Sequence, residues 1–175
     1  PQDGVHAIRI AAAAIAEMAI GRIGDDTTVN VGQIEGGRAS NIVPDYCEVS
    51  GELRSFSHEK ALEELAKVEQ IFAKEAEKRG GSIEFIRDIC YQAYKTDEKE
   101  SVVKEFQKAC TACGIKSSLI ATFGGSDQNK MSEHGIPGIV MASAMHQVHS
   151  CQEYTEVSEM AQVAGIVSEL LQMKE

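Results

Sequence analysis

Residues 46–55 alternate strictly between two classes of side chain, and this pattern constrains the fold more than any other segment. Apolar or small side chains occupy one face of the expected strand and charged or hydroxyl side chains the other: Cys47, Val49, Gly51 and Leu53 against Glu48, Ser50, Glu52 and Arg54. Such alternation is typical of a β-strand with one face buried and the other in solvent.

The segments on either side of this strand complete an α-β-β-α-β order. We expect a helix that stops at Gly21, a strand over 27–35, a helix from a Ser57 cap to Arg79, and a strand over 83–91. The inward stripe expected of the first helix is Val5, Ile8, Ala12, Ile15 and Ala19. This order predicts a ferredoxin-like β-α-β-β-α-β unit that lacks its first strand. A polar joint at 95–99 marks the expected domain boundary.

The remaining residues alternate helices with short strands. An Asp97/Glu100 capping box is expected to open a helix whose inward face includes Val103, Phe106 and Cys110. A strand over 117–122, a short helix opened by 124–127, and a strand over 138–142 are expected to follow. The last helix is expected to bury Val157, Met160, Ala161, Ala164, Val167 and Leu171. This alternation indicates a piece of an α/β sheet.

Composition excludes several classes of protein. With 17 basic and 27 acidic residues, the net charge of −10 argues against nucleic acid or an anionic membrane surface as the main partner. Apolar residues, 43% of the 175, suffice for a core, but no run approaches the roughly 20 needed to span a bilayer. Five irregularly spaced cysteines favour a reducing cytoplasm over a disulfide scaffold.

Three features could carry chemistry, and each also has an ordinary structural interpretation. His146 and His149, with Glu153 following, are placed after a strand, where they could bind a metal or act in catalysis. Gly124 and Gly125 precede a helix, either as an anion-binding turn or as an ordinary capped turn.

The third feature pairs Asn41 with Arg54, near the two ends of one strand. A forked amide and a forked cation could clamp a carboxylate. Equally, they could be a turn asparagine and a solvated arginine.

Five short motifs occur in an order that resembles one family, the zinc-dependent exopeptidases that include peptidase T (tripeptide aminopeptidase), glutamate carboxypeptidase and aminoacylase. The motifs are Gly-Gly-x-x-x-Asn-Ile-Val-Pro at 36–44, Leu-Arg-Ser at 53–55, Gly-Gly-Ser-Asp at 124–127, Gly-Ile-Pro at 135–137 and His-x-x-x-Glu-Tyr at 149–154. The opening residues 1–8 also resemble the start of the family's first lid helix. The resemblance covers essentially the whole chain and is closest to peptidase-T-like members.

The resemblance implies a lid or dimerisation domain over residues 1–94 and the closing part of a catalytic domain over 95–175. A complete site in this family holds two zinc ions, and His149 matches its final zinc ligand. Asn41 and Arg54 match lid residues that hold the substrate, with Asn41 acting in trans across a homodimer. Gly124 and Gly125 would supply backbone contacts at the substrate cleft.

In the family, the remaining zinc ligands and the general-base glutamate lie before the lid, and neither they nor the lid histidine that helps to polarise the scissile carbonyl has a counterpart here. We therefore expect no catalytic residue in this chain, no activity from it alone and, at most, weak zinc binding. The whole enzyme would hydrolyse amide bonds of small peptides with metal-activated water. Alternatives are a non-catalytic dimerisation module, or an N-acyl amino acid deacylase or carboxypeptidase. We also expect a homodimer through residues 1–94, and a second lobe that leaves Leu119, Ile120, Ile139 and Val140 needing cover.

Overall fold

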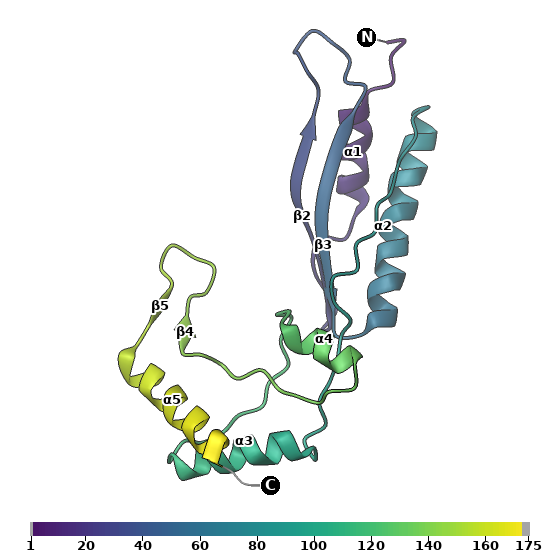
Figure 1. Ribbon diagram of the computed structural model, residues 1–175. Coiled ribbons are helices and arrows are strands. Elements are labelled where there is room, and N and C mark those ends of the chain that lie inside the picture. The colour runs from purple at the N-terminus through teal and green to yellow at the C-terminus, as the bar shows by residue number, and fades with distance from the viewer. Residues whose placement is uncertain (1, 173–175) are drawn as a thin grey trace. The chain divides into compact units, whose positions relative to one another are not determined.

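The computed structural model describes residues 2–172 and divides into two compact units, residues 1–93 and 94–175 (Figure 1). Pro1, the first residue of the stretch 1–8 that resembles the start of a lid helix, and residues 173–175, which close the expected second domain, lie outside the described residues. The assignment of 1–94 and 95–175 to a lid and a catalytic domain stays a prediction.

The first unit is built on an antiparallel sheet in the order β1-β2-β3. Its strands are β1 (Gly21–Ile23), β2 (Thr27–Gly36) and β3 (Cys47–Ser55). The two long strands agree with the sequence prediction, and Val29 pairs with Leu53 on the buried face. The register shifts between Val31 and Gln33, which leaves Gly32 as a bulge in β2.

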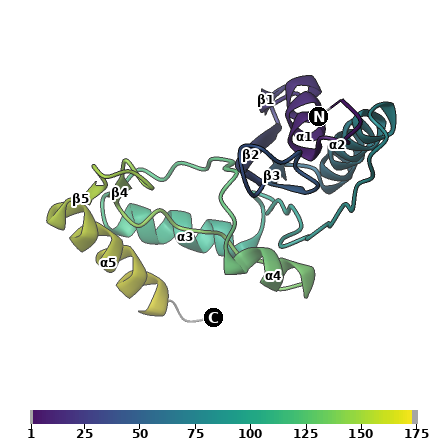
Figure 2. The same ribbon diagram turned by 90° about the horizontal axis from the view of Figure 1, so that it is seen from above.

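Helices α1 (Ala7–Glu17) and α2 (His58–Lys78) pack against each other and cover one face of this sheet (Figure 2). The predicted cap of α2 is confirmed, because the Ser57 side chain accepts a hydrogen bond from the Lys60 N–H at 3.4 Å. The stripe predicted for α1 is wrong. Its buried residues are Ile10, Ala11 and Ala14, whereas Ala12 is exposed. Because the middle of α1 is a run of small apolar residues without a polar side chain, residue spacing alone could not show which of its faces is buried.

Two details of the first unit differ from the prediction. Residues 83–91 are described without any strand pairing, and their side chains Ile86 and Ile89 are 82% and 51% exposed. The short strand β1 was not expected. It forms because the turn at 24–26 folds Ile23 back against Thr27. The mixed α and β character of the unit is confirmed, but its last predicted strand is not.

The described part of the second unit, residues 94–172, contains three helices and one small hairpin. The helices are α3 (Ser101–Ala112), α4 (Asp127–Glu133) and α5 (Val157–Gln172). The hairpin pairs β4 (Met145–His146) with β5 (Tyr154–Thr155). Its small core contains Ala109, Cys110 and Ile166, with Phe106 packed against them, so the inward face predicted for α3 is confirmed.

Three predictions for the second unit are wrong. Residues 117–122 and 138–142 are described without strand pairing. The expected capping box of α3 is absent, because Glu100 makes no side-chain cap and the Asp97 carboxylate accepts instead from the Lys99 N–H at 2.8 Å. A capping box forms at α4 instead, where the Ser126 N–H donates to Asn129 Oδ1 at 3.0 Å.

The stripe predicted to be buried on α5 is largely the exposed one. Val157 and Leu171 are 81% and 82% exposed, while Ile166 on another side of the helix is buried. Apolar residues occupy more than one face of α5. The helical spacing predicted one of these faces as buried, but α3 packs against another. In the described part of the chain, no helix has both the length and the apolar character to cross a membrane.

Candidate functional site

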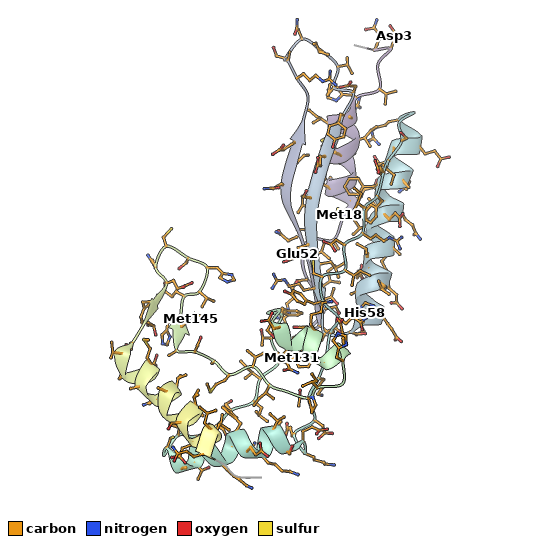
Figure 3. The ribbon with its side chains drawn as sticks, viewed as in Figure 1. Asp3, Met18, Glu52, His58, Met131 and Met145 are labelled. Atoms are coloured by element: carbon orange, nitrogen blue, oxygen red, sulfur yellow. The ribbon has the colours of Figure 1, made fainter. Side chains whose placement is uncertain are left out.

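The β4–β5 hairpin presents His149. We call residues 144–155 the His149 loop; Met145, labelled in Figure 3, marks its first strand. Met145 pairs with Thr155 and His146 with Tyr154, so the intervening residues 147–153 form the exposed turn of the hairpin. The sequence prediction that His149 lies in a loop ahead of the last helix agrees with this placement.

The backbone of the His149 loop is strained. Among the described residues, positive φ angles outside glycine occur at Ala144, Gln147 and His149, with values of 60°, 50° and 63°. Each such residue costs about 1–3 kcal/mol unless surrounding contacts compensate. Strain of this kind concentrates at functional sites, and here all three instances fall within one hairpin.

His146 has a different environment from His149. Its Nε2 lies 2.5 Å from Oε2 of Glu159 on α5, and its ring stacks on Tyr154 with centroids 4.8 Å apart and planes inclined by 16°. The contact with Glu159 ties the base of the hairpin to α5, and the ring contact joins its two strands. His146 is therefore engaged by Glu159, and the two histidines named from the sequence do not share one role.

The chemistry of the donors limits what this chain can bind. Among the described residues, the hydrogen bond of His149 is made by its backbone N–H and not by its imidazole, so the ring nitrogens are open to a ligand such as a metal. The same residues contain no group of three His, Cys, Asp or Glu side chains that could hold a metal ion. His149 thus fits one ligand position, and the described residues do not complete a site.

The Gly124–Gly125 turn is exposed and precedes α4, as expected, but it offers less to an anion than the sequence suggested. The Gly124 N–H already donates to Thr122 Oγ1 at 2.8 Å. The Ser126 N–H is taken by Asn129, and α4 has only 7 residues, so its dipole is small.

Arg54 and Asn41 are kept far apart within one chain. Asn41 lies in the exposed loop between β2 and β3, and Arg54 lies near the far end of β3. The seven residue steps from Cys47 to Arg54 alone span about 24 Å of extended strand. The two side chains therefore cannot clamp one carboxylate within a single subunit.

Arg54 already holds a carboxylate of its own strand. Its Nε and one terminal nitrogen donate to the two carboxylate oxygens of Glu52, labelled in Figure 3, at 2.8 and 2.7 Å. This bidentate hydrogen bond holds the pKa of Glu52 below its ordinary value and raises that of Arg54.

Sequence reasoning missed two of these partners. Glu52 could have been found, because residues two apart on a strand share a face and the alternation already placed it beside Arg54. Glu159 carried no such signal, since 13 residues separate it from His146.

Comparison with known proteins gives consistent matches. The family model for the peptidase dimerisation domain matches residues 1–80. The uncharacterized protein YqjE of Bacillus subtilis strain 168 is 34% identical over 172 residues, which are 98% of this chain and 46% of YqjE. Aminopeptidase PepT of Bacillus cereus is 36% identical with a TM-score of 0.82, over 98% of this chain and 47% of PepT.

A tripeptidase of Staphylococcus aureus is 31% identical with a TM-score of 0.91, over 98% of this chain and 46% of the tripeptidase. The chain thus spans about half the length of the relatives that it matches. Residues 1–80 have the fold of a peptidase dimerisation domain, and over 98% of its length the chain is similar in sequence and fold to an aminopeptidase PepT and a tripeptidase.

Proposed function

We propose that this chain supplies the dimerisation domain and the closing part of the catalytic domain of a peptidase-T-like zinc metallopeptidase. The whole enzyme would hydrolyse amide bonds of small peptides. The observation that carries this proposal is the similarity to a tripeptidase along 98% of the chain, with the His149 loop in the matched region. The family resemblance adds the order of the five motifs.

His149 would be one ligand of a two-zinc centre, held by its neutral imidazole. Zinc in such a centre supplies a metal-activated water as nucleophile. This chain contributes the ligand and its support but no catalytic acid or base. We therefore propose that the chain alone is inactive and binds zinc weakly, because three protein ligands are the usual minimum.

Substrate would be held by residues of both subunits of a homodimer. Arg54 would take a substrate carboxylate or carbonyl, and Asn41 would act from the partner subunit. The length of β3 between the loop that carries Asn41 and the position of Arg54 supports this division. The backbone at Gly124 and Gly125 would border the cleft. The proposed compartment is the cytoplasm, which the five free cysteines support.

The test compares zinc content and peptide hydrolysis of the chain alone with those of the chain combined with the N-terminal half of a relative. We expect zinc and tripeptide hydrolysis only in the combination, and loss of both in His149→Ala. His134→Ala, at the end of α4, is the matched control. Sub-micromolar zinc binding by the chain alone that His149→Ala abolishes would contradict the proposal.

Other outcomes identify the alternatives. A combination that never becomes active, while the chain dimerises, indicates a non-catalytic dimerisation module. Hydrolysis of N-acyl amino acids in preference to tripeptides indicates a deacylase. A monomer by light scattering at low micromolar concentration would contradict the homodimer.

Arg54→Lys tests the substrate role separately. A point charge cannot replace the planar fork of a guanidinium, so we expect a loss of about 1–3 kcal/mol in transition-state stabilisation, measured as kcat/KM. Arg38→Lys, in the β2–β3 loop, is the control. Unchanged kcat/KM in Arg54→Lys would show that Arg54 does not contact the substrate.

A further inference from the structure

Each strained residue of the His149 loop has one backbone group bound by a side chain of the same loop. The Thr155 hydroxyl donates to the Ala144 carbonyl at 2.6 Å, and the Ser150 hydroxyl donates to the Gln147 carbonyl at 2.7 Å. The third bond runs in the other direction: the His149 N–H donates to Oε2 of Glu153 at 2.8 Å. The strain is therefore compensated locally, one bond per residue.

The Glu153 bond acts on the backbone of His149 and leaves its ring untouched. The φ angle describes rotation about the bond between N and Cα, so fixing the direction of the N–H helps to fix the left-handed conformation at His149. Glu153 is itself positioned, because its N–H donates to the Ser150 carbonyl at 3.2 Å. A charged acceptor also makes this a stronger bond than a neutral one.

Packing does not account for this arrangement. His149 and Glu153 are both exposed, and neither belongs to the buried cluster of this unit. A left-handed histidine gains nothing for an exposed loop where a glycine would adopt the same angle without strain. The left-handed position is occupied by a histidine instead, and its imidazole has no partner among the described residues.

We infer that Glu153 is a positioning residue, whose carboxylate holds the backbone of His149 so that the imidazole is presented in one direction before it binds. This inference rests on the proposed function, in which His149 is a metal ligand. It assigns to Glu153 a contact with the backbone of that ligand rather than with the metal or the substrate.

The first test uses this chain and needs no metal. We expect Glu153→Ala to speed hydrogen exchange of the His149 amide about tenfold and to shift its Cα resonance away from left-handed values. Glu153→Gln keeps an acceptor oxygen at the same position and should restore most of the protection. Gln152→Ala, whose side chain makes no described bond, is the control. Equal exchange in wild type and Glu153→Ala would overturn the inference.

The second test measures zinc affinity of the combined enzyme by competition with a chromophoric chelator. We expect Glu153→Ala to weaken zinc binding by about 10–100-fold, as loss of a ligand's support does elsewhere, and Glu153→Gln to weaken it much less. Equal losses in both variants would show that charge, and not the hydrogen bond, matters, and would overturn the inference.

The two proposals fail in different ways. If His149→Ala leaves zinc binding intact, the metal role of His149 is wrong, and with it the functional meaning of the Glu153 bond. If His149→Ala abolishes zinc binding while Glu153→Ala changes neither exchange nor affinity, only the positioning inference is wrong.

Discussion

Two segments with strand-like sequences form strands in the first unit, whereas two in the second do not. In the first unit, the alternating segments become β2 and β3, because each lies along the other and their backbone groups pair. In the second, residues 117–122 and 138–142 have the composition of strands but are described without pairing. Local pattern makes a segment suitable for a sheet, whereas a strand exists only where a neighbour accepts its hydrogen bonds.

In both units the unpaired segments are the ones that leave apolar side chains in solvent. In the first unit Ile86 is 82% exposed, and in the second Ile120 and Val140 are 82% and 60% exposed. This agrees with the expectation that the second lobe needs cover.

The largest predicted effect compares matched isoleucines in the two cores. Ile10 and Ile166 are 7% and 6% exposed, and each lies on a helix. We expect Ile10→Ala to lower the free energy of unfolding by about 3–4 kcal/mol, and Ile166→Ala by about 2 kcal/mol, because the smaller cluster can collapse around the lost atoms. Denaturant unfolding followed by amide exchange in each unit measures both. Equal losses would show that the second core is packed as well as the first.

A smaller effect tests how tightly β2 and β3 approach. A Cβ on Gly51 would lie 2.7 Å from the Asn30 carbonyl oxygen, whereas at Gly32 the nearest atom is 3.8 Å away. Gly51→Ala should therefore destabilise by about 1–3 kcal/mol through a forced backbone shift, and Gly32→Ala by less than about 0.5 kcal/mol. Thermal unfolding gives both values. A harmless Gly51→Ala would mean that the paired strands are as adaptable as the unpaired segments.

The two units also differ in backbone strain at positive φ angles. Positive φ angles in the described first unit fall on glycines, and those in the His149 loop fall on other residues. We expect Gln147→Gly to stabilise the chain by about 0.5–1 kcal/mol, because glycine adopts that angle freely. Gln152→Gly, without a positive φ, should destabilise by a similar amount. If both variants destabilise, the loop is not strained at Gln147.

The smallest effect is a pH dependence in the first unit. Lys60 donates a hydrogen bond to Asp26, and this bond holds the pKa of Asp26 below its ordinary value of 3.8. A lowered carboxyl pKa stabilises the fold above the ordinary value, and this contribution is lost as the pH falls through the lowered one. Wild type and Asp26→Asn should therefore differ in stability at neutral pH and converge in acid. A difference that grows on acidification would contradict this sign.

The sequence predicted the positions of the five helices in the described residues and of β2 and β3, because hydrophobic periodicity is a local property. It failed where the outcome depends on a distant partner. Residues 83–91 were expected to pair and do not, and the exposed face of α5 was expected to be buried.

The candidate site divides in the same way. The position of His149 ahead of the last helix predicted a loop, and the alternation of residues 46–55 already placed Glu52 and Arg54 on the same face. The strained angle at His149 and the contact of His146 with Glu159 left no trace in residue types. Both depend on backbone geometry or on a residue from another element.

Because Arg54 is bound by Glu52, the carboxylate binding proposed for Arg54 would require a ligand to displace the Glu52 carboxylate. A tethered carboxylate competes at a fixed local concentration, which short tethers set at millimolar or above. A free carboxylate that meets only Arg54 would have to exceed that concentration to displace Glu52. A ligand that also makes contacts elsewhere gains the advantage of a second attachment point. If Arg54 binds a substrate carboxylate as proposed, the competition from Glu52 would disfavour small free acids and favour molecules long enough to make a second contact.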